Sequence, residues 1–256
     1  MTSVMAVHAH PDDIEHLAAG TLAVLAKAGH RIVIATLTAG ECGSDSTDLA
    51  QTAAIRKAEA ARAAALIGAD YLCADLPDLG VFNDDRQRRA VTELVRRAGC
   101  GIVITASPAD YHPDHEAASQ LVRDACFAAS VPNYRTGEAA PLPAIPHLYF
   151  MDPIGGRDRE GVPVTPHFGC DLSGEAGAAF EAKRAMLAAH ESQAAWVARQ
   201  HGIADHLGSM ETWTRRRGAD FGVAAAEGFR QYRHPPYPKT PALQELLGPA
   251  LLIAAS

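Results

Sequence analysis

Short apolar runs alternate with longer helical stretches along the first 152 residues of the chain. The apolar runs have the length of buried strands, and the stretches between them, many rich in alanine, have the length of helices. Such alternation implies a mostly parallel sheet that is covered by helices on both faces. Strands are expected at Val4–His8, Arg31–Thr38, Tyr71–Ala74, Gly101–Thr105 and Leu148–Met151, and helices at Ile14–Ala28, Leu49–Ile67, Arg86–Ala98 and Glu116–Ala129.

The second part of the chain is less regular. Prolines, glycine and polar residues predict a surface loop at Pro132–Pro146, and glycines and prolines predict an irregular stretch at Asp152–Gly174. Two helices are expected after it, at Ala176–Gln200 and Asp205–Arg217. The predicted fold class is therefore α/β, with a doubly wound, mostly parallel sheet and a C-terminal helical or irregular extension. With 256 residues, 48% of them hydrophobic, the chain can bury the core of a single domain, predicted to span 1–256.

Composition limits the partners that the chain can bind. The formal net charge is −7, and a nucleic-acid-binding protein needs a basic face for the phosphates, so nucleic acid is not an expected partner. The basic run Arg215-Arg216-Arg217 is too short to change this, and we interpret it as a solvated helix end.

Targeting signals are not evident in the sequence. The N-terminus reaches histidine and carboxylates before a signal-peptide apolar region could form, and no apolar run has the ~20 residues that span a bilayer. The five cysteines form no CxxC pair, so neither a disulfide framework nor a thiolate zinc site is indicated. We expect a cytoplasmic protein without an integral membrane segment, and whether it forms a homo-oligomer is left open.

Two near-copies of one tetrapeptide follow two of the predicted strands. His10-Pro11-Asp12-Asp13 comes directly after the first strand, and His112-Pro113-Asp114-His115 follows the fourth strand after a short loop. Independent placement of residues would give only about 0.05 His-Pro-Asp triplets in a chain of this composition. Ligands of doubly wound sheets bind beyond the carboxyl ends of the strands, so both segments are expected to face one crevice.

The residue types in these segments suit a hydrolytic metal site. Two imidazoles and one carboxylate would hold a tetrahedral zinc ion and leave its fourth position open for water. Such a metal lowers the pKa of the water to about 7 and polarises the carbonyl that the water attacks. Two carboxylates and one imidazole would remain for proton transfer and for stabilising the oxyanion.

Simpler interpretations exist for the individual residues. A lone histidine at a strand end is usually structural, and His8 is most simply a hydrogen-bonded core histidine. Asp12 or Asp13 would serve equally well as the N-cap of the following helix, a role that is compatible with metal binding. The paired occurrence of the tetrapeptide favours the functional interpretation.

The segments AVHAHPDDIE and SPADYHPDH resemble the two signature motifs of the LmbE/PIG-L family of zinc-dependent N-deacetylases. Supporting similarity covers most of the chain up to Gln193, in TAGECGS (38–44), in IRKAEAARAAALIGA (55–69) followed by LPD (76–78), and in KRAMLAAHESQ (183–193). The family has a Rossmann-like fold, in agreement with the pattern of predicted strands and helices.

The resemblance implies a role for each residue of the two tetrapeptides. His10, Asp13 and His115 match the zinc ligands, although such ligands also accept other divalent metals such as Fe²⁺. Asp12 matches the general base. His112 matches the histidine that stabilises the tetrahedral intermediate, and Asp114 matches the acidic residue that orients it.

A looser motif assigns a role to one further residue. Arg56 matches an arginine that contacts the substrate, so its loss should mainly raise KM. Without the resemblance we would interpret Arg56 as an exposed helix residue.

The resemblance implies a zinc-dependent hydrolase that removes the N-acetyl group from an N-acetylglucosamine-type conjugate by attack of a zinc-bound water. The alternatives are an amidase acting on a larger acyl group or a thiol conjugate, and a sugar-binding module with a vestigial metal site. Family substrates include N-acetylglucosaminyl phosphatidylinositol, glycosylated thiol precursors, chitobiose and antibiotic intermediates. The sequence departs from some relatives at 132–146 and after Gln200, the regions expected to shape the substrate pocket.

Overall fold

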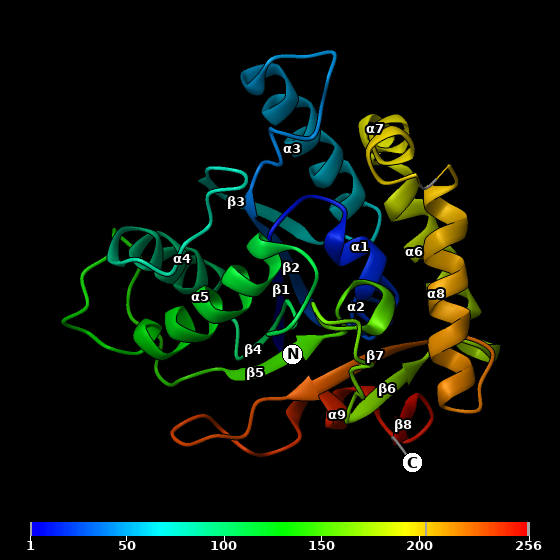
Figure 1. The fold of residues 1–256 in the computed structure, drawn as a ribbon. Helices are drawn as coiled ribbons and strands as arrows, with labels where there is room; N and C mark the ends of the chain where they lie inside the picture. The colour runs from blue at the N-terminus through cyan, green and yellow to red at the C-terminus, as the bar shows by residue number, and fades with distance from the viewer. Residues whose placement is uncertain (1, 203, 255–256) are drawn as a thin grey trace.

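The computed structural model describes residues 2–202 and 204–254. One eight-stranded sheet runs through the molecule, with α4 and α5 on one side and α1, α2, α6 and α8 on the other (Figure 1). The strands are β1 (Ser3–His8), β2 (Arg31–Thr38), β3 (Asp70–Leu76), β4 (Ile102–Thr105), β5 (His147–Met151), β6 (Phe168–Asp171), β7 (Ala226–Gln231) and β8 (Leu252–Ala254). The helices are α1 (Asp13–Leu17), α2 (Ala19–Lys27), α3 (Leu49–Ala65), α4 (Asp85–Ala98), α5 (Pro113–Ala129), α6 (Gly177–Ala188), α7 (Glu191–His201), α8 (His206–Asp220) and α9 (Ala242–Leu247), with short 3₁₀ turns at Ile154–Gly156 and Gly174–Ala176.

The strand order is β3-β2-β1-β4-β5-β7-β6-β8. The pairs from β3 to β5 are all parallel, and the pairs that join β7, β6 and β8 are antiparallel. The predicted α/β fold with a mostly parallel, doubly wound sheet is therefore confirmed. The order of the strands reverses between β1 and β4, which is where such sheets bind their ligands.

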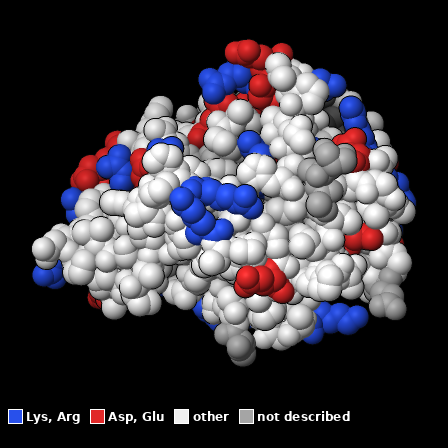
Figure 2. Space-filling model, turned by 90° about the horizontal axis from the view of Figure 1, so that it is seen from below, with Lys and Arg blue, Asp and Glu red and all other residues white. Residues whose placement is uncertain are grey.

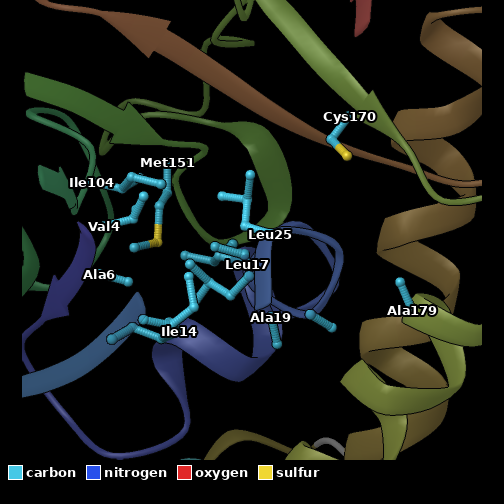
Figure 3. Packing of buried hydrophobic residues seen from close by; sticks show 14 of the residues in the cluster. Val4, Ala6, Ile14, Leu17, Ala19, Leu25, Ile104, Met151, Cys170 and Ala179 are labelled. Carbon is cyan, nitrogen blue, oxygen red and sulfur yellow. The ribbon is translucent and has the colours of Figure 1, made fainter. Parts of the chain in front are cut away.

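Residues of β1 alternate between two cores because the sheet is covered on both faces. Val4 and Ala6 pack with α1, α2 and α6, whereas Met5 and Val7 pack with α4 and α5. Figure 3 shows the first of these cores, where Ile14 and Leu17 of α1 lie close to Val4 and Ala6. Each strand of a parallel sheet that is buried on both faces has a nearly continuous apolar sequence. The positions of these strands could therefore be predicted closely from the sequence.

Two predicted helices are each divided into two. The predicted helix Ile14–Ala28 breaks at Ala18, where Glu227 of β7 accepts hydrogen bonds from the N–H groups of Gly20 and Thr21 at 3.0 and 2.7 Å. The predicted helix Ala176–Gln200 ends at Ala188 and restarts as α7. There Glu59 of α3 accepts from the N–H and hydroxyl of Ser192 at 2.9 and 2.6 Å. In both cases a carboxylate distant in sequence satisfies the free N–H groups of a new helix start.

The C-terminal part differs from the predicted helical or irregular extension. It contributes β7, which lies between β5 and β6, and the apolar tail forms β8 at the edge of the sheet. β6 also falls inside the stretch predicted to be irregular. These strands are short, and β6 and β7 contain glycine and charged residues. Their sequences therefore lack the alternation of apolar and polar residues by which a strand can be predicted. Because β7 lies inside the sheet, between β5 and β6, we propose that the described residues form a single domain.

The predicted loop at 132–146 contains no helix or strand. It is fastened to α4, because the Glu93 carboxylate accepts hydrogen bonds from the Thr136 hydroxyl at 2.8 Å and the Ala139 N–H at 3.0 Å. No residue of this loop lines the pocket described below, so the expectation that it shapes the substrate pocket is wrong.

One face of the molecule shows how few charged side chains gather there. On the face shown in Figure 2 most side chains are uncharged, and a small group of basic side chains near the centre is not extended into a basic surface. Among the described residues, no helix is long and apolar enough to cross a membrane.

Candidate metal centre and active site

The two tetrapeptides lie side by side at the carboxyl ends of adjacent strands. β1 ends at His8 and β4 ends at Thr105, and the two strands pair in parallel with Val7 opposite Thr105. The turn after β1 opens α1, and the loop after β4 opens α5. The predicted convergence of the two segments on one crevice is thus observed.

The first turn is held by the Asp13 carboxylate. Asp13 Oδ2 accepts from the backbone N–H of His10 at 2.9 Å and lies 2.6 Å from His8 Nδ1. Asp12 has a φ of 95°, in the left-handed region that is uncommon for any residue other than glycine. As the residue before α1, Asp12 makes no side-chain capping hydrogen bond, so the simple N-cap interpretation of Asp12 does not hold.

The second turn has a different backbone. His112 is extended at the N-cap of α5, with φ −96° and ψ 130°, and Pro113 fills the first helical turn. His112 Nδ1 accepts from the backbone N–H of Asp114 at 3.2 Å. The hydrogen of the neutral ring is therefore left on Nε2.

The three residues that match the family's ligands face one another in a compact triangle. His10 Nδ1 lies 3.3 Å from His115 Nε2, and the Asp13 carboxylate places Oδ2 3.4 Å from His10 Nδ1 and Oδ1 3.3 Å from His115 Nε2. Ligand atoms ~2.0–2.2 Å from a tetrahedral zinc ion stand roughly 3.3–3.6 Å apart. The spacing of these donors therefore fits a tetrahedral divalent metal.

Neighbouring donors make other ligand sets geometrically feasible. Each of three further sets places its donor atoms within 4.8 Å of one another: His10, His112 and His115; His8, Asp13 and His115; and His10, Asp78 and Asp114. The sets overlap, so they describe one continuous cluster rather than separate sites.

Carboxylates behind the two imidazoles orient their rings. His10 Nε2 lies 3.1 Å from Asp78 Oδ1 and 3.4 Å from Asp114 Oδ2, and His115 Nδ1 lies 3.1 Å from Asp110 Oδ1. A hydrogen on each of these nitrogens leaves the opposite nitrogen of each ring free to bind a metal. Sequence reasoning did not assign roles to Asp78 and Asp110, although LPD and SPADYHPDH, the segments that contain them, are both part of the family resemblance.

Asp114 does not orient His112 through its carboxylate, as the resemblance implied. Besides approaching His10, that carboxylate accepts hydrogen bonds from the N–H groups of Leu79 at 2.8 Å and Val81 at 3.4 Å. Only the backbone N–H of Asp114 contacts the His112 ring. Its side chain therefore supports His10 and the loop after β3.

Charges in the cluster attract one another strongly. Burial disfavours protonation of His115, but Asp13 and Asp110 outweigh it and raise its pKa to about 9. Burial would raise the pKa of Asp13, yet His115, His8 and His10 hold it well below the usual value. The same carboxylates that favour a proton on His115 would favour a metal cation in its place, so the cluster has the charge pattern of a cation site.

A pocket of about 660 Å³ opens over the cluster. Asp12, Asp13, His10, His112 and His115 line its floor. Its walls include Tyr111 and residues of α7 and α8, the helices on the right of Figure 1. The only two tryptophans of the chain, Trp196 and Trp213, both lie in these walls.

Arg56 lies at the pocket but is not the exposed helix residue that its sequence alone suggested. It is 4% exposed, and its guanidinium donates to the carbonyl oxygens of Pro11 at 2.7 Å and Gly40 at 2.8 Å. Gly40 has a φ of 67°, and a Cβ there would stand 2.1 Å from this guanidinium, so another residue would strain the backbone and displace Arg56. Arg56 thus clamps the turn that carries Asp12, whose Oδ1 is 3.6 Å away.

Known proteins are similar to this chain in sequence and in fold. Residues 5–126 match the family model described as PIG-L, GlcNAc-PI de-N-acetylase. A diacetylchitobiose deacetylase from Thermococcus kodakarensis is 26% identical in an alignment of 203 residues that covers 74% of this chain and 69% of the relative.

Two solved structures have closely similar folds. A conserved protein from Thermus thermophilus is 28% identical with a TM-score of 0.73, covering 94% of this chain and 100% of that one. The 4-carboxy-2-hydroxymuconate hydratase of Pseudomonas putida is 22% identical with a TM-score of 0.73, covering 93% and 99%. Because the same fold occurs in a hydratase, activity has to be argued from the site. The sequence match itself lies in the first half of the chain: residues 5–126, which include both tetrapeptides, are similar to the PIG-L (LmbE) family domain.

Proposed function

We propose that this chain is a divalent-metal-dependent hydrolase that removes the N-acetyl group from an N-acetylglucosamine-type conjugate. The observation that carries the proposal is the triangle of His10, Asp13 and His115 with Asp12 and His112 beside it on the floor of one pocket. The match to a family of N-deacetylases and the similarity to a diacetylchitobiose deacetylase support the choice of substrate.

His10, Asp13 and His115 would hold the metal, and we propose zinc, which this donor set suits. Imidazole and carboxylate donors also accept Fe²⁺. When bound, the cation would supply Lewis acidity, polarising the acetyl carbonyl and lowering the pKa of water.

Asp12 would accept the proton of the attacking water. Its carboxylate lines the pocket next to Asp13, and burial raises the pKa of Asp12 above its ordinary value despite the nearby Arg56. A raised pKa makes a carboxylate a better base. As the bond between the acetyl carbon and the amide nitrogen breaks, the same proton can pass from Asp12 to the nitrogen, giving a free amine and acetic acid, which ionises to acetate near pH 7.

His112 would stabilise the negative charge that develops on the acetyl oxygen. Burial, together with the nearby His10 and His115, lowers the pKa of His112 to about 4, so the ring is neutral near pH 7. Since Nδ1 accepts from the Asp114 N–H, Nε2 carries the hydrogen and is available as a donor. A fixed neutral donor stabilises an oxyanion without neutralising the metal-binding carboxylate.

The walls of the pocket suit a sugar. Aromatic rings pack well against the apolar face of a pyranose while leaving its hydroxyls free for hydrogen bonds. Tyr111, Trp196 and Trp213 provide such surfaces, and Gln193 and Gln200 provide polar groups.

Acetate release from N-acetylglucosaminides, measured with and without a chelator and with readdition of zinc or Fe²⁺, tests the proposal. We expect release that the chelator abolishes and the metal restores, with Asp12→Asn as the inactive control. Rates measured on a series of substrates with N-acetyl to N-butyryl groups distinguish a deacetylase from an amidase for larger acyl groups. If metal-loaded protein releases no more acetate than Asp12→Asn from any member of a panel of amino-sugar conjugates, the proposed function is wrong.

A further inference from the structure

A second cavity adjoins the proposed active site. It has a volume of about 350 Å³, and Gly155 and Trp213 line both it and the larger pocket. A molecule that extends out of the active-site pocket past Trp213 would therefore enter this cavity.

One face of α8 forms a wall of the second cavity. Trp213, Arg216, Arg217 and Asp220 all line it, at the spacing that places side chains on the same side of a helix. The basic run predicted to be a solvated helix end is thus divided between two environments. Arg215 lies over the Phe180 ring, whereas Arg216 and Arg217 face the cavity.

The guanidinium groups of the cavity differ in their partners. Arg217 is 5% exposed and paired with Asp152 at 2.7 Å and Asp220 at 2.9 Å. Arg157 and Arg216 also line the cavity, and Arg157 donates to the carbonyl oxygen of Gly161 at 2.6 Å. Among the side chains that the structure describes, no carboxylate lies within ion-pairing distance of either guanidinium. Two cationic groups without a protein counter-ion therefore border this cavity of an otherwise acidic chain.

The wall between the two cavities is tightly packed. A Cβ on Gly156 would stand 2.1 Å from Trp213 Cη2, and the Arg217 guanidinium stacks 4.9 Å from the centre of the Trp213 ring. The Trp213 ring is thus packed between Gly156, in the loop after β5, and the Arg217 side chain of the same helix. Because the ring lines both cavities, it forms part of the boundary between them.

We propose that the second cavity binds an anionic group on the aglycone of the amino-sugar conjugate, a carboxylate or a phosphate, through Arg216 and Arg157. Guanidinium groups match both anions because their planar N–H groups can donate two parallel hydrogen bonds. The inference rests on the proposed function, since it adds the chemistry of the second half of the same substrate.

Matched pairs of N-acetylglucosaminides test this preference. One pair carries a short carboxylated aglycone or its methyl ester, and the other a phosphorylated aglycone or its unphosphorylated alcohol. We expect kcat/KM to be about three- to tenfold higher for the anionic member of at least one pair, as for a partly exposed ion pair. The pair that shows the preference identifies the anion, and the preference should shrink as salt is added.

Arg216→Ala should reduce the ratio of anionic to neutral kcat/KM to about one. Arg215→Ala is the matched control, because its neighbouring guanidinium packs over Phe180 outside the cavity and the ratio should persist. Equal use of anionic and neutral members by the unaltered enzyme would overturn the inference while leaving the deacetylase proposal intact.

Direct binding keeps the two proposals separable. Calorimetric titration of the same conjugates into Asp12→Asn protein measures affinity without turnover. Tighter binding of the anionic member, lost in the Asp12→Asn, Arg216→Ala double variant, would support the anion site even if no conjugate were deacetylated. Equal affinities for both members of both pairs would refute it.

Discussion

The two His-Pro-Asp turns are nearly identical in sequence but differ in structure. In the first, the helix begins at the fourth residue, Asp13, after a left-handed Asp12. In the second, the helix begins at the second residue, Pro113, directly after an extended His112. The helix start is therefore shifted by two residues between the copies.

This shift gives equivalent positions different surroundings. The first histidine of one copy, His10, presents Nδ1 to the proposed metal site, whereas that of the other, His112, uses Nδ1 to cap a helix. The third residue of one copy, Asp12, faces the pocket, whereas Asp114 contacts His10 and the loop after β3. Repeated motifs therefore predict a shared site more reliably than they predict shared roles.

The largest expected difference is between the two third-position aspartates. Asp12→Asn should keep its metal and lose about 10²–10⁴ in kcat, because the amide cannot accept the proton. Metal content by elemental analysis and kcat, measured together, check this. Full activity in Asp12→Asn would show that Asp12 is not the general base. Neither third-position aspartate, Asp12 or Asp114, would then have a role in proton transfer.

The first-position histidines should differ almost as strongly. His10→Ala should lose the metal, whereas His112→Ala should retain it and lose about 10²–10³ in kcat, as when one oxyanion donor is removed. The metal stoichiometry of both variants, with His115→Ala as the reference for a lost ligand, shows whether each histidine is a metal ligand. Loss of metal from His112→Ala would instead favour the ligand set of His10, His112 and His115.

A smaller effect is expected at Asp114. Since its carboxylate supports His10, Asp114→Asn should weaken metal binding about 10–100-fold, and added metal should restore most of kcat. Metal titration followed by kcat at saturation measures both quantities. If kcat stays low at saturating metal, Asp114 acts on the reaction itself, as expected of a residue that orients His112.

Arg56 provides a test of the first turn alone. Family resemblance predicts mainly a higher KM for Arg56→Ala, but the clamp on Pro11 and Gly40 adds a second effect. Leaving these carbonyls without their donor should cost about 1–3 kcal/mol of unfolding free energy and lower kcat about tenfold. Denaturant unfolding and steady-state kinetics, with Arg62→Ala on the same helix as control, separate the two. If Arg56→Ala changes KM but neither stability nor kcat, the proposed clamp on the turn is wrong and only the contact with substrate remains.

The smallest effect concerns the helices that follow the turns. α1 carries the buried His16 where α5 carries Ala118, six residues after the first histidine of each turn. Burial, with Lys183 and His206, lowers the pKa of His16 to about 3, whereas an unfolded histidine titrates near ~6.5. As pH falls below ~6.5, the unfolded chain takes up a proton that the folded protein excludes, so stability falls.

Between pH 7 and 5 this single group should cost the metal-free protein about 2 kcal/mol. His16→Gln should remove that part of the acid sensitivity, and His234→Gln, at an exposed position, should not. Urea unfolding of the metal-free proteins at both pH values measures the difference. Parallel losses of stability in the unaltered and His16→Gln proteins would show that His16 does not contribute.

The parallel half of the fold was predictable because its signals are local. β2 begins and ends at the predicted residues, Arg31 and Thr38, and the other four predicted strands differ by a few residues at their ends. The tetrapeptides could be found because two rare triplets both followed strands. Their convergence followed from the rule for strand carboxyl ends, and the structure places them together.

What the sequence did not reveal depends on distant partners. Glu227 divides the first helix from more than 200 residues away, and Asp78 reaches His10 from a loop after another strand. The helix register of the two turns was also hidden, because proline is compatible with both positions. The roles assigned to the site residues stay predictions until the variants above are measured.

The position of β7 bears on how the chain acquires its structure during synthesis. β5 is complete at Met151, but its partner β7 begins only at Ala226, about 75 residues later. At the ~5–20 residues per second of translation, one edge of β5 stays unpaired for roughly 4–15 s. An unpaired strand edge is a template for association with other chains, so nascent chains stalled before Ala226 should be the aggregation-prone species of this protein.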